Sequence, residues 1–239
     1  MRRLGCLTLG IALTLAAILP VFFPTAMGAG IAKLGLSPDT GLLLLLAMLV
    51  GGTIHVPLWR LPADRFLRTD PLAVFGLAGA LPRLERRSRE AVVALNVGGG
   101  VLPLALAGYE IVRLASGAVW EGAVESPAER PSVPGVLVAL ALATALNAAV
   151  SYRLARRVPG TGFVVPGIVP AIVAMASALF LAADAAAPVM LASGVLGTLV
   201  GTALRLRHLR RRPIGLASIG GGGAFDAIVL VVVLSALLK

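Results

Sequence analysis

The chain of 239 residues is strongly apolar: 58% of its residues are hydrophobic, 13% are charged, and the mean hydropathy is +0.96. This composition excludes an ordinary soluble globular protein and indicates a multi-pass membrane protein, whose first partner is the lipid bilayer. The net charge of +10 indicates no nucleic-acid partner, because the basic residues lie between apolar stretches, where membrane insertion accounts for them. The single cysteine, Cys6, excludes an intramolecular disulfide and a multi-cysteine metal site.

A helix of about 20 apolar residues crosses a bilayer with all its backbone groups paired internally. On that measure the sequence predicts an all-α bundle of about seven transmembrane spans, forming one integral membrane domain over residues 1–239. The expected spans are residues 4–23, 41–59, 91–113, 133–152, 162–182, 185–204 and 214–238. The first could instead be a cleaved signal peptide, since a basic start, an apolar run and small residues are what signal peptidase requires; its length favours a retained span.

The basic residues alternate along the chain in a way that predicts its orientation. Most of the 21 Lys and Arg residues fall in segments on one side of the expected spans, and the other side holds Lys33, Arg113, Arg130 and Lys239. Short cytoplasmic loops retain basic residues, so we expect the N-terminus inside and the C-terminus outside. The inside loop 60–90 contains the basic run PRLERRSRE, and we expect it to meet anionic lipid head groups at the cytoplasmic face.

The last expected span contains an acid, Asp226, directly after the glycine run Gly220, Gly221, Gly222 and Gly223. If the whole segment 214–238 spans, Asp226 lies near the bilayer centre, where a lipid-facing charge costs at least about 3 kcal/mol. We therefore expect it to face the protein interior or a water-filled cavity, as a binding or ion site behind a glycine-broken helix. The alternative is that a protonated Asp226 only bonds a neighbouring helix and that the glycines permit close helix packing.

Three further polar residues, His55, Asn96 and Asn147, lie a few residues from the cytoplasmic ends of their expected spans. We expect them to converge with the glycine break into a polar vestibule open to the cytoplasm. For the two asparagines, hydrogen bonding between helices is an equal alternative. His55 could relay protons, but a lone histidine near the interface is more often an ordinary satisfied polar residue.

The stretches NVGGGVLP and SIGGGGAFD are alike, although such likeness arises easily in a chain with 28 glycines. The sequence contains no P-loop, no set of His and Cys metal ligands and no serine paired with a histidine in a nucleophile motif. It therefore predicts no catalytic residue, no metal site and no cofactor.

From TIHVPL through ALNVGGGVLPLAL, VPGTGFVVPGIVPAIVA and APVMLASGVLGTLVG to ASIGGGGAFDAI, the sequence resembles a family of prokaryotic multi-pass membrane proteins described as domain of unknown function 1614. The resemblance implies a membrane fold and a recurring Asp226, but no reaction. We expect the protein to lie in the cell inner membrane. It also implies an acid near the end of the sixth span, in a sequence of Gly, a small residue, Asp and Leu. Here GTAL places Ala203 at that position.

Two acids on consecutive spans would resemble the intramembrane aspartyl proteases, in which two carboxylates share a proton. This chain offers only Asp226, because Asp184 begins the sixth expected span at its outer end. Three functions therefore remain: proton- or cation-coupled transport of an unknown small molecule or ion at Asp226, a protease-like protein that is inactive because of Ala203, and a membrane scaffold or assembly protein. Transport leads, because one acid beside a glycine break suffices for it.

Overall fold

A computed structural model of the chain describes residues 32, 34–62, 90–120, 131–158, 162–208 and 216–238. Within these ranges the fold is mainly helical, as the sequence predicts. The helices are α2 (Pro38–Gly51), α3 (Leu102–Ser116), α4 (Val133–Leu154), α5 (Ile168–Leu181), α6 (Ala186–His208) and α7 (Gly223–Leu237), with short helical turns η2 (Val97–Val101), η3 (Ala118–Trp120) and η5 (Ala183–Ala185). The expected span 4–23 and the basic run of loop 60–90 lie outside the described residues.

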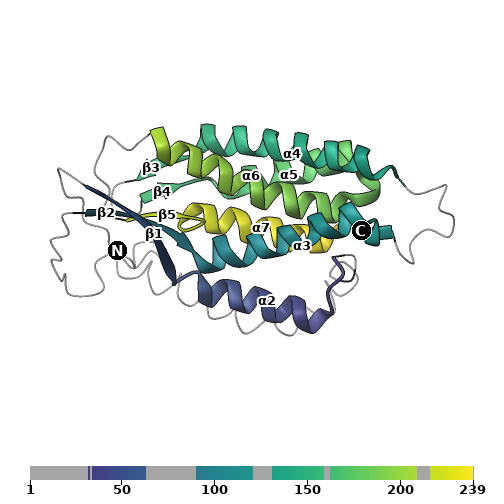
Figure 1. Cartoon of the computed structure of the whole chain (residues 1–239), viewed down its shortest axis with the longest axis horizontal. Coiled ribbons are helices and arrows are strands. Elements are labelled where there is room, and N and C mark those ends of the chain that lie inside the picture. The colour runs from purple at the N-terminus through teal and green to yellow at the C-terminus, as the bar shows by residue number, and fades with distance from the viewer. Residues whose placement is uncertain are drawn as a thin grey trace, which may run out of the picture.

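Short strands lie together at one end of the helix bundle, called here the sheet end (Figure 1). They are β1 (His55–Pro62), β2 (Glu90–Asn96), β3 (Arg156–Val158), β4 (Gly162–Val164) and β5 (Leu216–Ile219). The first sheet has the order β1-β2-β5, in which β2 is antiparallel to β1 and parallel to β5. The strands β3 and β4 form a separate antiparallel pair.

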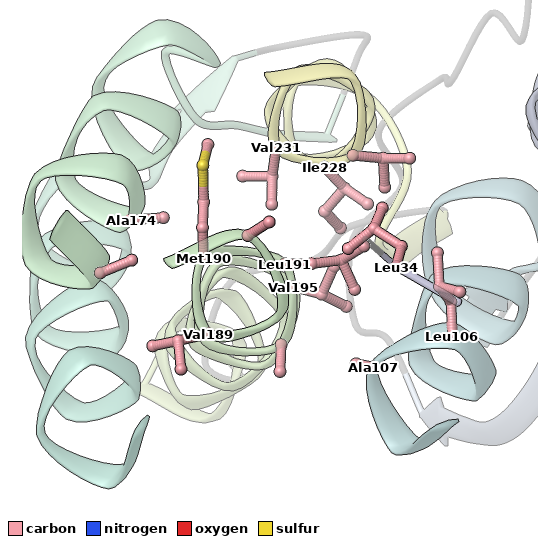
Figure 2. Close-up of a cluster of buried hydrophobic side chains, with 14 of the residues drawn as sticks. Leu34, Leu106, Ala107, Ala174, Val189, Met190, Leu191, Val195, Ile228 and Val231 are labelled. Carbon is pink, nitrogen blue, oxygen red and sulfur yellow. The ribbon is translucent and has the colours of Figure 1, made fainter. Parts of the chain in front are cut away.

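Successive helices run alternately toward the sheet end and away from it (Figure 1). The helix α6 is central, because it packs against α3, α4, α5 and α7. Around α6 the core is built from aliphatic side chains and alanines: Figure 2 shows Leu191 and Val195 of α6 beside Leu34 and Leu106, and Met190 beside Val231 of α7. The other described helix, α2, packs on η2 and α3.

Three helical stretches are long and apolar enough to cross a membrane within the described ranges: Val97–Ser116, Val133–Leu154 and Ala183–Leu206. The other apolar helices, Pro38–Gly51, Ile168–Leu181 and Ala224–Leu237, are shorter. The last two long stretches correspond to the expected spans 133–152 and 185–204. The described residues thus support several apolar spans, although fewer full-length ones than the sequence predicts.

The expected helices over 41–59, 91–113, 162–182 and 214–238 are wrong at their sheet-end parts, where the structure has strands. His55 lies on β1 and Asn96 ends β2, so neither belongs to a helix. The physical reason is local: Gly51 and Gly52 end α2, and the short segments that follow or precede the glycine runs pair with one another instead. Hydropathy alone does not distinguish such buried strands from helix.

Candidate functional site

Two similar segments lie side by side at the sheet end, and each passes from a strand through a glycine run into a helix. In the first, β2 leads through Gly98, Gly99 and Gly100 into α3; in the second, β5 leads through the run that begins at Gly220 into α7. Leu95 of β2 is paired with Ile219 of β5, so the two glycine runs begin at the same level. The stretches NVGGGVLP and SIGGGGAFD are therefore neighbours in space and have the same direction.

The two glycine runs touch through their backbones, and this contact is called the glycine junction. A Cβ atom on Gly99 would overlap the carbonyl oxygen of Gly220, and one on Gly220 would overlap the carbonyl of Gly99. Gly98 is equally close to the end of α2, where a Cβ atom would overlap the carbonyl oxygen of Met48. Only glycine permits this approach of three backbone segments. The junction therefore ties α2, α3 and α7 together at the sheet end.

Asn96 provides most of the hydrogen bonds of the junction. Its Oδ1 accepts from the backbone N–H of Gly99 at 2.7 Å, and its Nδ2 donates to the carbonyl oxygen of Gly52 at 2.7 Å. The same Nδ2 lies 3.3 Å from Nε2 of His55. Because the Nδ1 atom of His55 lies 3.3 Å from the carbonyl oxygen of Thr53, a neutral ring has its proton on Nδ1 and accepts at Nε2. Asn96 is fully buried, so its first role is to hold the junction.

The glycine run before α7 brings Ser218 close to the same histidine. Gly220 and Gly222 both have positive φ, of 76° and 59°, which is a conformation that favours glycine. A Cβ atom on Gly221 would lie 3.3 Å from Nε2 of His55 and would overlap Oγ of Ser218. This Oγ is buried and forms no hydrogen bond within the described residues. The structure thus places His55, Asn96 and the glycine run of the last helix together.

Asp226 lies in the first turn of α7, is exposed, and forms no hydrogen bond or ion pair within the described ranges. Its Cβ faces Gly167 at the start of α5, where an added Cβ atom would lie 3.2 Å away. The N-terminal ends of α5 and α7 therefore meet beside this carboxylate, and both helix dipoles favour a negative charge there. The preceding residue, Phe225, turns instead toward the junction: a Cβ atom on Gly99 would lie 2.8 Å from its ring.

The depth of Asp226 along the bundle follows from the contact between α6 and α7. A Cβ atom on Gly194 would lie 2.6 Å from Cγ1 of Val231, and Gly194 is at the middle of the apolar stretch Ala183–Leu206. Asp226 precedes Val231 by five residues, which places it about 7 Å from that middle, toward the sheet end. The expected position at the centre rested on a continuous helix over 214–238, and the strand β5 changes that estimate.

Asn147 lies elsewhere, on the seam between α4 and α6. Its Nδ2 donates to the carbonyl oxygen of Gly194 at 3.4 Å, and a Cβ atom on Gly197 would lie 2.7 Å from its own Cβ. One turn further on, Gly201 is equally close to Ser151. No contact joins Asn147 to the glycine junction in the described residues, so the expected vestibule contains His55 and Asn96 without it. Close packing of small residues with a polar side chain between the helices accounts for its position.

A family model described as "Protein of unknown function (DUF1614)" matches residues 49–238, which is most of the chain. The chain belongs to this family. No curated protein and no solved structure matches it. Among the described residues of this DUF1614 member, no group of three or more His, Cys, Asp or Glu gathers as metal ligands.

The position at which the family resemblance implies a second acid, Ala203, lies on α6 and is half-buried against the core. It follows Gly194 by nine residues, so it lies about 6 Å nearer to the sheet end than Asp226 does. The acid at the other end of α6, Asp184, is exposed on η5 and is far from both. Neither Ala203 nor Asp184 therefore gives Asp226 a second carboxylate beside it.

Glu110 was not among the site residues expected from the sequence, although it lies within the expected span 91–113. The structure places Glu110 on α3 with no exposed surface, and both its oxygens accept from Nη1 of Arg113, at 3.0 and 3.4 Å. Helical spacing contained the signal, because Leu106 and Leu114 lie four residues before and after Glu110 and both are buried. Glu110 therefore belongs to the core-facing stripe of α3.

Proposed function

We propose that this DUF1614 member is a multi-pass protein of the cell inner membrane that carries a proton or a small cation, alone or coupled to a small solute, and that Asp226 is the group that binds it. The observation that supports this most is the position of Asp226. It is an exposed carboxylate within the apolar length of the bundle, and it has no partner within the described ranges. A charge at that depth is costly when it faces lipid, so a carboxylate kept there favours an aqueous route that reaches it.

The surroundings of Asp226 support cation binding rather than a structural role. The N-termini of α5 and α7 lie beside it and favour the ionised carboxylate, which is the form that attracts a cation. Discontinuous helices that begin inside the membrane are a recurring way to build ion sites in carriers. The His55–Asn96 pair lies at the glycine junction, against which the Phe225 ring packs, and supplies polar groups near the same helix start.

The distribution of basic residues supports a cytoplasmic sheet end. In the described residues this end holds the basic positions on β1, at the close of α4, on β3 and at the close of α6, namely Arg60, Arg153, Arg156, Arg157, Arg205 and Arg207. The opposite end holds Arg113 on α3. Short cytoplasmic segments retain Lys and Arg, so Asp226 would be reached from the cytoplasm, across a surface that attracts anionic lipid head groups.

Flux through the purified protein in liposomes tests the proposal. The vesicles receive a gradient of protons, Na⁺ or K⁺, one cation at a time, and a trapped dye that responds to the cation under test reports the flux. We expect at least one gradient to drive a flux that Asp226→Asn abolishes and that Asp184→Asn leaves unchanged. Asp184 is the matched control, because it is an exposed aspartate at the other end of the bundle. Absence of flux under every gradient, or equal flux in wild type and Asp226→Asn, would contradict transport.

A protease-like function is the alternative, and the antiparallel contact between α6 and α7 is the observation in its favour. Since Ala203 lies about 6 Å from the level of Asp226, an aspartate there could approach it only with some movement of α6. Ala203→Asp should therefore not create cleavage of a helix-unstable transmembrane substrate. Cleavage gained in Ala203→Asp and lost again when Asp226→Asn is added would favour an ancestral carboxylate pair over transport.

A further inference from the structure

Glu110 is the only fully buried carboxylate among the acids whose side chains the structure describes. It lies on the apolar stretch Val97–Ser116, about 5 Å past the middle of that stretch and away from the sheet end. Asp226 lies on the other side of the middle. The two acids therefore lie in opposite halves of the bundle, and the proposed function assigns a role only to Asp226.

A purely structural role explains Glu110 poorly. Its partner Arg113 is on the same helix, three residues later, so the ion pair joins no two helices. Burial of such a pair costs several kcal/mol per ion, and replacement by apolar residues is often neutral or stabilising. Acids retained inside apolar spans more often belong to ion or proton pathways.

A short segment before α2, residues 34–36, packs on the bundle at this end and is called here the strap. Leu34 is 2% exposed and packs among the core side chains, beside Leu106 in Figure 2. A small apolar cavity lies beneath the strap, and its lining includes Leu34 and Leu36 of the strap, Leu106 of α3 and Val232 of α7. The strap is therefore inserted into the bundle, with a space under it.

The strap is latched to the part of α3 that carries Glu110. The carbonyl oxygen of Gly35 accepts a hydrogen bond from Oη of Tyr109 at 3.1 Å. A Cβ atom on Gly35 would lie 2.6 Å from Cζ of Arg113 and 2.7 Å from that Oη, and its φ of 65° also favours glycine. The guanidinium of Arg113 lies 5.6 Å from the centre of the Tyr109 ring. Arg113 therefore lies between the strap and Glu110.

From this arrangement we propose that Glu110 is a second cation-binding carboxylate, closed off from the far side by the strap, with Arg113 as the resident cation that a small inorganic cation replaces when the strap opens. The proposal extends the proposed function to a second acid. The charges balance in both states, because one carboxylate in an apolar surrounding holds one cation. The guanidinium of Arg113, whose side chain is partly exposed at the end of α3, leaves Glu110 when the strap opens.

Chemical modification of Glu110 tests the gate without measuring flux. The purified protein in detergent is treated with a water-soluble carbodiimide and a small amine, and mass spectrometry quantifies the peptide that contains Glu110. We expect slow modification in wild type and modification several-fold faster in Gly35→Ala, whose added Cβ displaces Arg113 and Tyr109. Gly108→Ala is the matched control, because a Cβ atom there meets nothing within 4 Å, and it should react like wild type. Tyr109→Phe removes only the latch hydrogen bond and replaces Gly35→Ala if that variant does not fold.

The same reaction, run in Na⁺, K⁺ and choline chloride at equal ionic strength, tests cation binding. In the opened variant we expect Na⁺ or K⁺ to slow the modification of Glu110 several-fold relative to choline. The Asp226→Asn background should give the same protection, which separates this inference from the function proposed for Asp226. Equal rates in wild type, Gly35→Ala and Tyr109→Phe would refute the gate, and equal rates in all three salts would refute the cation site.

Discussion

Replacing Gly99 by alanine probes the glycine junction with a single methyl group. An added Cβ atom would overlap the carbonyl oxygen of Gly220 and would lie 2.8 Å from the ring of Phe225. The ring could turn, since Phe225 is only half-buried. The carbonyl of Gly220 has less freedom, because the neighbouring Ile219 is paired with Leu95 across the two parallel strands.

The structure sets the size and the sign of the effect. Overpacking a close contact by one methyl group usually costs about 1–3 kcal/mol, and a backbone neighbour that cannot rotate away places Gly99→Ala at the upper end of that range. A loss of about 3 kcal/mol lowers the folding equilibrium constant roughly 100-fold. Gly108→Ala lies on the same continuous helical segment and meets nothing within 4 Å, so it should stabilise by about 0.5–1 kcal/mol through helix propensity.

Equilibrium unfolding in mixed micelles, followed by the loss of helical circular dichroism, measures both variants against wild type. The two changes are chemically identical and differ only in their surroundings, so opposite signs are the expected result. If Gly99→Ala were as stable as Gly108→Ala, the backbone contact between the two glycine runs would not exist in the folded protein. The proposed arrangement of α3 and α7 around one junction would then be wrong.

Three further predictions concern the rest of the bundle. Arg156 and Asp184 are both exposed and lie at opposite ends of the bundle. Single cysteines placed there should react with impermeant thiol reagents from opposite sides of the membrane, and labelling of both from one side would contradict the orientation. Glu110→Gln should cost about 3–5 kcal/mol because it leaves Arg113 without its buried counter-charge, and Glu110→Gln with Arg113→Gln should recover part of that stability in the same unfolding assay. Gly197→Ala should lower stability by about 1–3 kcal/mol because its Cβ would press on α4, and an unchanged unfolding midpoint would show a looser seam than the structure has.

Much of the helical frame could be predicted from apolar length alone, and the sheet could not. The stretch that forms α4 is apolar throughout and has no glycine run, so the expected span 133–152 agrees with Val133–Leu154. The segments around His55, Asn96 and Ser218 are just as apolar, but they satisfy their backbone groups by pairing with one another. Such pairing depends on partners 28 or more residues away along the chain, which no local count of apolar residues can detect.

The candidate site, too, could be predicted from the sequence only in part. Asp226 and its glycine run stand out from sequence, because an acid in an apolar stretch is costly wherever it lies. Glu110 did not stand out, because it lies three residues before the end of the expected span 91–113 and is followed by Arg113 and further acids. Its burial depends on α3 continuing to Ser116, where Gly117 in a left-handed conformation ends the helix. The position of that glycine is the local signal that the helix continues beyond the expected end at Arg113.

The two acids also constrain how a carrier of this shape would work. Asp226 is exposed near the sheet end, whereas Glu110 is buried behind Arg113 and the strap near the other end. In the proposed carrier, this arrangement would be a state open on one side only. Both acids lie on helices that begin at the glycine junction, so a tilt of α3 relative to α7 about the contact of Gly99 with Gly220 would change both ends together. A rigid junction would transmit such a tilt, and a loose one would not.

Gly99→Ala therefore distinguishes a hinge from a simple packing contact. If the variant folds, it should slow the modification of Glu110 in the Gly35→Ala background as well as the flux at Asp226. An effect on one acid without the other would show that the two ends move independently.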